Sequence, residues 1–229
     1  MHIPACDTSN LELEDFERAL QAAQRPNPSY DISKWIYVPN YYSEYRYLLG
    51  TRGQKPLICV GINPSTAAPD ALDNTLKSVE RIALHNGFDS FLMFNVYAQR
   101  ATNPDDMELT YNPRLHQENL KAFDYALSLD ACGAPAVWAA WGNIIEKRPY
   151  LPACVRDMIE VLQKGAPPPP PLPAKGQPPG SFRCPGLYCC AAVKTGERRR
   201  RHRPVTAGAS VFIFLCGSGA PSGQFLPQL

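Results

Sequence analysis

No apolar run in this 229-residue sequence approaches the roughly 18 residues that a membrane-spanning helix needs. The first residues, Met1 to Asp7, also lack the basic segment and following apolar stretch with which a secretory signal begins. A membrane or secreted protein is therefore not expected, and the predicted location is the cytoplasm. The eight cysteines are interpreted as reduced thiols, because disulfide frameworks are typical of short secreted chains.

Several well-known binding and catalytic signatures are also absent. The sequence has no G-x-x-x-x-G-K-[ST] phosphate loop, no G-x-G-x-x-G dinucleotide loop and no G-x-S-x-G nucleophile turn. Only four histidines are present, and Cys184 with Cys189 and Cys190 does not have the spacing of a zinc site. We therefore expect no metal ion and no bound cofactor.

Acidic residues are nearly missing from the last part of the chain. Residues 165–229 contain one acid, Glu197, with eight basic residues, 12 of the 24 prolines and 9 of the 15 glycines. The formal charge of this segment is +7, whereas that of residues 1–164 is −5. Such a change in composition predicts two parts: an α/β domain over residues 1–164, with its core at 35–162, and a Pro/Arg/Gly-rich tail over 165–229.

The tail allows more than one interpretation. Pro167–Pro171 predicts an extended polyproline segment, and the basic run Arg198–Arg201 could contact nucleic acid or an acidic protein partner of unknown identity. The apolar residues Val211–Cys216 have nothing nearby in the sequence to pack against. A GC-rich gene translated out of frame would also give this composition. We therefore predict an irregular tail, either disordered or a frame-shifted replacement of a native strand and helix.

Short apolar runs alternate with helical patterns in residues 1–164. Unbroken apolar runs predict strands that are buried on both faces, as in a parallel sheet, over residues 56–62, 91–96 and 135–141. Helical spacing of apolar residues predicts helices over residues 11–24, 73–86, 116–129 and 152–163. Two aromatic-rich segments, 35–38 and 45–49, predict an antiparallel pair before the sheet. The predicted fold class is α/β, a three-layer sandwich with a mainly parallel central sheet.

Polar residues follow each of the three predicted buried strands. These residues are Asn63, Pro64, Ser65 and Thr66 after the first strand, Asn95, Arg100 and Thr102 after the second, and Gly142 and Asn143 after the third. Because the carboxyl ends of parallel strands meet at one edge of the sheet, a ligand site is expected there. The same residue types are the commonest turn formers, so ordinary turn chemistry is the alternative.

Two charged residues near this edge each have two interpretations. Arg100 could hold a phosphate or a carboxylate with two parallel hydrogen bonds, or it could pair with Asp73, Asp105 or Asp106. Asp73 is well placed to cap the helix that follows it, although a carboxylate so close to Asn63 could also act in the site.

Several of these segments, in this order and spacing, carry a family resemblance. They are Gly61 to Ala67, Asp73 to Thr75, Asn95 to Thr102 and Ala140 to Gly142. Over residues 35–162 they resemble the bacterial domain of unknown function 1643 family, which has no assigned biochemical role. Gly61-Ile62-Asn63-Pro64 is also similar to the first active-site motif of the mismatch-specific uracil-DNA glycosylases. This second resemblance implies a uracil-DNA glycosylase-like fold and gives Asn63 the catalytic role of positioning the attacking water.

Cleavage of an N-glycosidic bond requires a gripped base, an oriented water and donors for the departing anion. An asparagine carbonyl can orient the water, residues 64–66 could supply the donors, and Tyr97 or Trp141 could stack on the base. The resemblance also requires a second motif near the C-terminus, but no histidine lies between Lys164 and Arg201. Three functions are therefore carried forward: a glycosylase-like enzyme, a non-catalytic module that binds a nucleobase, a nucleotide or single-stranded nucleic acid, and an interaction protein that acts through its basic tail. A chain impaired by loss of the second motif is a further possibility.

Overall fold

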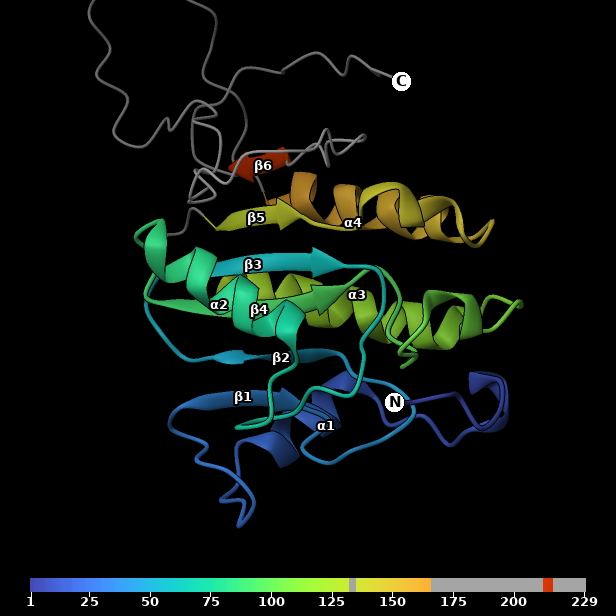
Figure 1. The fold of residues 1–229 in the computed structure, drawn as a ribbon, viewed down its shortest axis with the longest axis horizontal. Coiled ribbons are helices and arrows are strands. Elements are labelled where there is room, and N and C mark those ends of the chain that lie inside the picture. Colours follow the sequence, from blue (N-terminus) through green and yellow to red (C-terminus); the bar gives the residue numbers. More distant parts are fainter. Residues whose placement is uncertain (132–134, 166–211, 216–229) are drawn as a thin grey trace, which may run out of the picture.

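Three parallel strands form the centre of the fold in the computed structural model, which describes residues 1–131, 135–165 and 212–215 (Figure 1). They are β3 (Pro56–Gly61), β4 (Ser90–Asn95) and β5 (Ala136–Ala139). β3 lies between the other two and pairs in parallel with both. Every residue of β3 and β4 is buried. The parallel arrangement predicted from the unbroken apolar runs is therefore confirmed for these strands.

Antiparallel strands complete both sides of the sheet. The strand order is β1-β2-β4-β3-β5-β6, with β1 at Trp35–Val38, β2 at Leu48–Thr51 and β6 at Phe212–Leu215. β1 pairs with β2, β2 with β4, and β5 with β6, each in the antiparallel sense. The predicted antiparallel pair is confirmed, but the prediction of a mainly parallel sheet is corrected to a mixed one. The short connection 39–47 explains β1 and β2, because a parallel crossover needs a dozen residues or more.

A glycine permits the close approach of β2 to β4. A Cβ atom at Gly50 would lie 2.1 Å from the carbonyl oxygen of Phe91, which is closer than any real Cβ contact. Gly50 pairs with Leu92 in the register of the two strands. A larger residue at position 50 would therefore separate β2 from the parallel strands.

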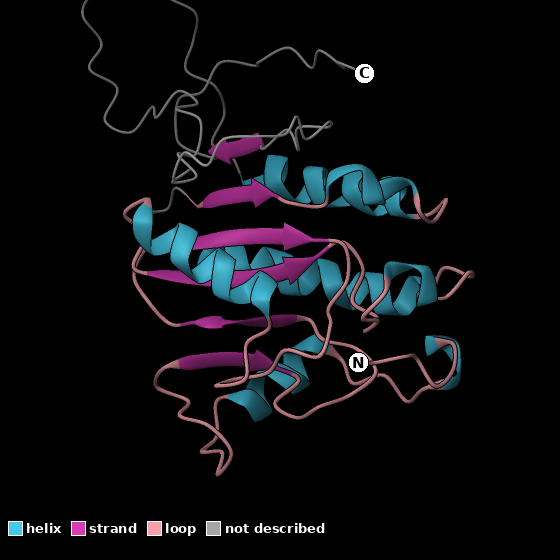
Figure 2. Ribbon diagram, in the orientation of Figure 1, coloured by secondary structure: helices cyan, strands magenta, loops and turns pink. Residues whose placement is uncertain are grey.

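Helices cover both faces of the sheet, which gives the three predicted layers (Figure 2). α2 (Asn74–His85) packs on one face through Leu76, Val79 and Ala83. The other face carries three helices, α1 (Phe16–Ala23), α3 (Pro113–Ser128) and α4 (Leu151–Gly165). Short 3-10 helices occupy Thr8–Asn10, Pro104–Asp106 and Gly142–Glu146. None of the helices in the described residues is long and apolar enough to cross a membrane.

Side-chain caps fix where the helices begin. The Asp73 carboxylate accepts a hydrogen bond from Leu76 N at 2.9 Å, so the predicted N-cap of α2 is confirmed. α3 begins at Pro113, three residues before the predicted start. The Asn112 side chain accepts from the backbone N–H groups of Arg114 and Leu115, and proline suits the first helical turn.

One part of the predicted tail is ordered in the sheet. Phe212–Leu215 was expected to be irregular with nothing to pack against, but its backbone pairs antiparallel with β5, from Ala139↔Phe212 to Ala136↔Leu215. This pairing covers the edge of β5 that would otherwise present unpaired backbone groups. The predicted polyproline and basic runs lie outside the described residues.

Candidate functional site

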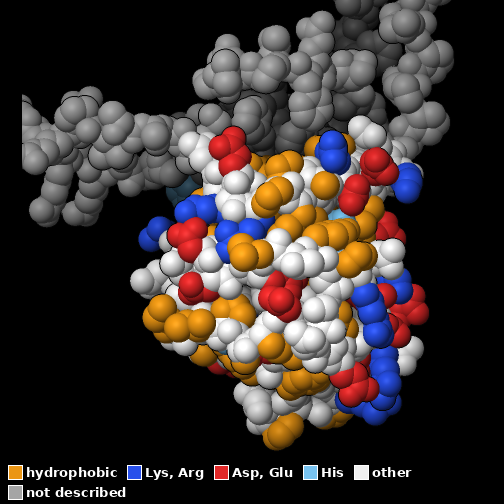
Figure 3. Space-filling view, turned by 90° about the vertical axis from the view of Figure 1, so that its right-hand side faces the viewer, with side chains coloured by type: hydrophobic (Ala, Val, Ile, Leu, Met, Phe, Trp, Pro, Cys, Tyr) orange, Lys and Arg blue, Asp and Glu red, His pale blue; other side chains and the backbone are white. Residues whose placement is uncertain are grey.

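A cavity of about 570 Å³ lies where the parallel strands end, at the N-terminus of α2. We call it the site cavity. Its walls come from the end of β3 and the loop after it, the first turns of α2, the 101–104 loop, β5 and the segment after β5. Figure 3 faces this edge of the molecule, where hydrophobic, acidic and basic side chains lie intermixed. The predicted location of the site at the strand ends therefore coincides with a real cavity of the size that small ligands occupy.

The predicted site residues divide into two groups. Five of them line the site cavity: Asn63, Ser65, Asp73, Thr102 and Trp141. The other six do not line it: Pro64, Thr66, Asn95, Tyr97, Arg100 and Gly142. The convergence expected from the strand ends thus holds for the first two segments, whereas neither Gly142 nor Asn143 of the third segment lines the cavity and only the preceding Trp141 does.

Asn63 is half-buried and is fixed by its own amide group. Its Nδ2 donates to the carbonyl oxygens of Ala101, at 2.7 Å, and Pro64, at 3.2 Å. Both amide protons are therefore used within the protein, and Oδ1 has no hydrogen-bond donor among the described residues. An acceptor that is held in this way at the wall of a cavity can orient a water or the N–H group of a ligand.

Asn95 holds the backbone of the loop that carries Asn63. It is fully buried, and in the amide orientation that satisfies its surroundings Nδ2 donates to the carbonyl oxygens of Asn63 (3.2 Å) and Phe94 (3.3 Å). Asn119 Nδ2 donates in turn to the Asn95 carbonyl at 2.9 Å. Asn95 therefore acts as a positioning residue and not as the ligand contact expected from the sequence.

The Asp73 carboxylate joins the Ser65 loop to α2. One oxygen caps the helix at Leu76 N, and the other accepts a short hydrogen bond from Ser65 Oγ. Both carboxylate oxygens are thus engaged inside the protein, although Asp73 lines the cavity. Across the cavity, Thr102 is held by the N-terminal segment, because His2 N donates to its Oγ1 at 2.6 Å.

Two buried arginines lie behind the Ser65 loop. Arg46, which is 1% exposed, lines the site cavity and donates from Nη1 to the Ala67 carbonyl at 2.9 Å. Arg100, which is fully buried, donates to the Ser65 carbonyl and to Tyr37 Oη, and its guanidinium lies over the Tyr42 ring at 4.3 Å. Burial and the neighbouring Arg100 lower the pKa of Arg46 to about 9, so Arg46 still carries its charge at neutral pH.

Arg100 and Tyr97 require corrections of their predicted roles. Arg100 donates to two backbone carbonyls and to the Tyr37 hydroxyl, and it forms no salt bridge with Asp73, Asp105 or Asp106 in the described residues. It therefore secures the loop instead of contacting a ligand directly. Tyr97 is fully buried, and its hydroxyl donates to Glu108, so its ring cannot stack on a base in the cavity. The chain turns inward after β4, which removes both side chains from the cavity.

Two aromatic side chains, those of Trp138 and Trp141, line the site cavity. Trp138 comes from β5, and Trp141 follows the end of that strand, with Ile144 beyond it in the 3-10 helix. The indole N–H of Trp138 is buried without a hydrogen-bond partner. Gly142 itself is exposed and adopts a φ of +55°, so it contributes the turn after Trp141 and not a ligand contact.

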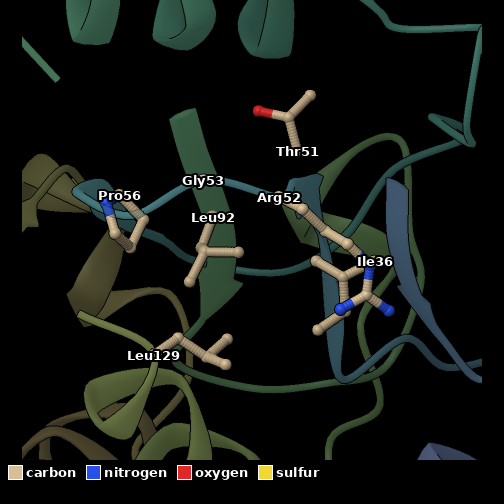
Figure 4. A pocket seen from close by; sticks show the side chains of 7 residues that line it. All are labelled: Ile36, Thr51, Arg52, Gly53, Pro56, Leu92 and Leu129. Carbon is tan, nitrogen blue, oxygen red and sulfur yellow. The ribbon is translucent and has the colours of Figure 1, made fainter. Parts of the chain in front are cut away.

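Among the described residues, the site cavity has no reactive cysteine, and no cluster of metal ligands is present. Cys59 lines the site cavity, but burial raises the pKa of its thiol to about 12, which keeps it protonated and unreactive at neutral pH. No three His, Cys, Asp or Glu side chains in the described ranges lie close enough to hold a metal ion. A second cavity of about 60 Å³ lies near the opposite ends of the strands (Figure 4), and its lining is mainly apolar.

Arg46 and Trp138 are among the cavity residues that the sequence did not predict. Arg46 lies in an aromatic-rich segment, where a single arginine looks like the exposed side of a strand. It reaches the cavity because the backbone beside it pairs with the segment after β4: Arg46 N donates to the Ala98 carbonyl at 2.9 Å. Trp138 lies within an apolar run and looks like core. Its unpartnered N–H could not have been detected without coordinates.

Comparison with known proteins identifies the family. Residues 46–178, more than half of the chain, match the family described as Protein of unknown function (DUF1643). The match extends beyond the predicted domain boundary at residue 164 and covers the cavity residues from Arg46 to Ile144. No curated protein and no solved structure matches the chain. The protein therefore belongs to the DUF1643 family.

Proposed function

We propose that the protein binds a ligand containing a nucleobase, either a nucleoside or a nucleotide, in the site cavity. The observation that carries this proposal is that two aromatic side chains, Trp138 and Trp141, line one cavity together with the polar side chains of Asn63 and Ser65. Flat bases stack on aromatic side chains, and hydrogen-bonding groups at their edges select among them.

The polar groups of the cavity suit the edge of a base. Asn63 Oδ1 offers an acceptor, and the buried Trp138 N–H offers a donor that the described residues do not use. A buried donor without a partner is costly, so a ligand acceptor that satisfies it would gain binding free energy of about 1–3 kcal/mol. A heterocycle with neighbouring N–H and C=O groups can meet both requirements at once.

Charge favours a small ligand over duplex DNA. Residues 1–164 carry a formal charge of −5, and acidic and basic side chains are mixed on the cavity face (Figure 3). Binding along a duplex depends on many basic contacts with phosphates. A single nucleotide or a short single strand needs only a local basic contact at the cavity.

The direct test is titration of the full chain with the four deoxynucleosides, deoxyuridine and their 5′-monophosphates. Tryptophan fluorescence and calorimetry should both show saturable binding of at least one base type. Trp141→Ala should weaken it by about 5- to 150-fold, the equivalent of 1–3 kcal/mol for one stacked base. Tyr41→Ala, which removes an exposed aromatic ring outside the cavity, is the matched control and should leave binding unchanged. Absence of saturation with every ligand would refute the proposal.

N-glycosidic hydrolysis is the second candidate, favoured by the free Oδ1 of Asn63. In this reaction a water held by Oδ1 attacks the sugar carbon C1′, the C–N bond breaks, and the base leaves with its electron pair and then takes up a proton. Chromatography of the incubated ligand would detect the free base. If the reaction depends on Asn63, Asn63→Ala should release no base even at ligand concentrations that saturate it. Binding by the unsubstituted chain without any base release would leave the non-catalytic binding function.

A further inference from the structure

The two buried arginines behind the site cavity have no carboxylate partner. Both donate to the same carbonyl oxygen, that of Ala67, at 2.9 Å from Arg46 and 3.4 Å from Arg100. Within the described residues neither guanidinium forms a salt bridge. Two adjacent positive charges that are removed from water destabilise the fold unless an anion compensates them.

The acids nearest to this pair are already engaged. Asp73 influences Arg46 electrostatically, but its two oxygens accept from Ser65 and Leu76. Glu44, which influences Arg100, forms a salt bridge with His2 at 3.2 Å. Burial raises the pKa of Tyr37, so its hydroxyl supplies no negative charge at neutral pH. The pair therefore retains uncompensated positive charge beside the cavity.

Only Arg46 can offer this charge to a ligand. Arg100 does not line the cavity, and its contacts with Ser65, Ala67 and Tyr37 already secure the loop. Arg46 lines the cavity, uses Nη1 for a single backbone carbonyl and leaves Nε without a partner. Its guanidinium thus lies in the cavity lining and keeps donors that the described residues do not use.

The N-terminus of α2 adds a second feature at the same place. Asn74 and Thr75 of its first turn line the cavity with Arg46, whereas the N–H of Leu76 is already taken by the Asp73 carboxylate. Backbone N–H groups in the first turn of a helix attract anions, and phosphate groups are frequent ligands there. We propose that Arg46 and the first turn of α2 bind a phosphate group of the ligand, so that the natural ligand is a nucleotide and not a free base or nucleoside. This inference depends on the proposed nucleobase site, which holds the other end of the same molecule.

The test compares three ligands that share one base. The full chain is titrated with a deoxynucleoside, its 5′-monophosphate and the corresponding dinucleoside monophosphate, which carries only a phosphodiester. We expect the monophosphate to bind at least tenfold more tightly than the nucleoside. Equal affinity of the dinucleoside monophosphate would support the phosphate site and identify single-stranded nucleic acid as the source. Weaker binding of the dinucleoside monophosphate than of the 5′-monophosphate would support the phosphate site and identify a mononucleotide as the ligand.

Two variants test whether Arg46 causes the preference for the monophosphate over the nucleoside. Arg46→Met should reduce the monophosphate-to-nucleoside affinity ratio to about one. Arg52→Met is the matched control, because this exposed arginine lines the small cavity at the opposite edge (Figure 4), and it should retain the ratio. A full ratio in Arg46→Met would overturn the inference.

The unsubstituted chain provides a test that does not depend on folding of the variant. Equal binding of nucleoside and monophosphate would overturn the phosphate site while the proposed function stands. If neither ligand binds, the proposed function fails and the phosphate site fails with it.

Discussion

Asn63 allows the sharpest test of the site geometry, because alanine and aspartate at this position should have different effects. A residue that only oriented a water from an exposed position would tolerate aspartate, which also has an acceptor oxygen. In the structure, however, the amide nitrogen of Asn63 donates to the carbonyl oxygens of Ala101 and Pro64. Asn63→Asp would place a carboxylate oxygen against these two carbonyls.

The magnitudes follow from the two hydrogen bonds. Each contributes about 1 kcal/mol net, so Asn63→Ala should lower the free energy of unfolding by about 2 kcal/mol. Asn63→Asp loses the same bonds and adds repulsion between negative oxygens, for a total loss of about 3–4 kcal/mol at pH 7. The same repulsion raises the pKa of the introduced carboxyl. The stability of Asn63→Asp should therefore recover as the pH falls toward 4.5, where the carboxyl binds a proton and can donate to one carbonyl.

The assay is urea unfolding of the full chain, followed by circular dichroism at pH 7 and pH 4.5. Asn143→Ala is the control, since this exposed asparagine follows Trp141 without lining the cavity, and its effect should stay within about 0.5 kcal/mol. If Asn63→Asp is as stable as the unsubstituted chain at pH 7, the amide orientation is wrong and the water-positioning role loses its geometric basis.

Two further predictions concern the core. Burial raises the pKa values of the Cys59 and Cys154 thiols from about 9 to about 12, so the folded state keeps protons that the unfolded state loses above pH 9. Each thiol should therefore lower the free energy of unfolding by roughly 2 kcal/mol at pH 10.5 relative to pH 8; an unchanged urea midpoint would contradict this. The buried Glu108 carboxylate accepts from the backbone N–H and the hydroxyl of Thr8 at 2.7 and 2.8 Å. Glu108→Gln turns an amide N–H toward these donors and should cost about 2–3 kcal/mol, measurable by the same unfolding assay, whereas a neutral effect would show that the network does not stabilise the fold.

The strands and helices around the site could be predicted because their signals are local. An apolar run such as residues 56–62 has to be buried on both faces, and Asp73 followed by an apolar stripe can satisfy the first turn of a helix. The position of Asn63 at the strand end follows from the same run. These properties depend on the neighbouring residues alone.

The pairing of the sheet edges depended on distant segments. Phe212–Leu215 carried no signal that it would join β5, because edge pairing requires only a free row of backbone groups and not a particular sequence. For the same reason, the mixed sheet could not be distinguished from a mainly parallel one by hydrophobic pattern.

The sequence by itself determined the three buried strands, the capped helix and the arrival of polar residues at one edge. Only the tertiary structure decided which of those residues contact the cavity. It turned Tyr97 and Arg100 inward and brought Arg46, which precedes β2, into the lining of the cavity together with Asn74. The physical reason is that a polar residue at a strand end can face the cavity or the interior with the same local sequence. The choice depends on which carbonyl and hydroxyl groups the rest of the fold supplies.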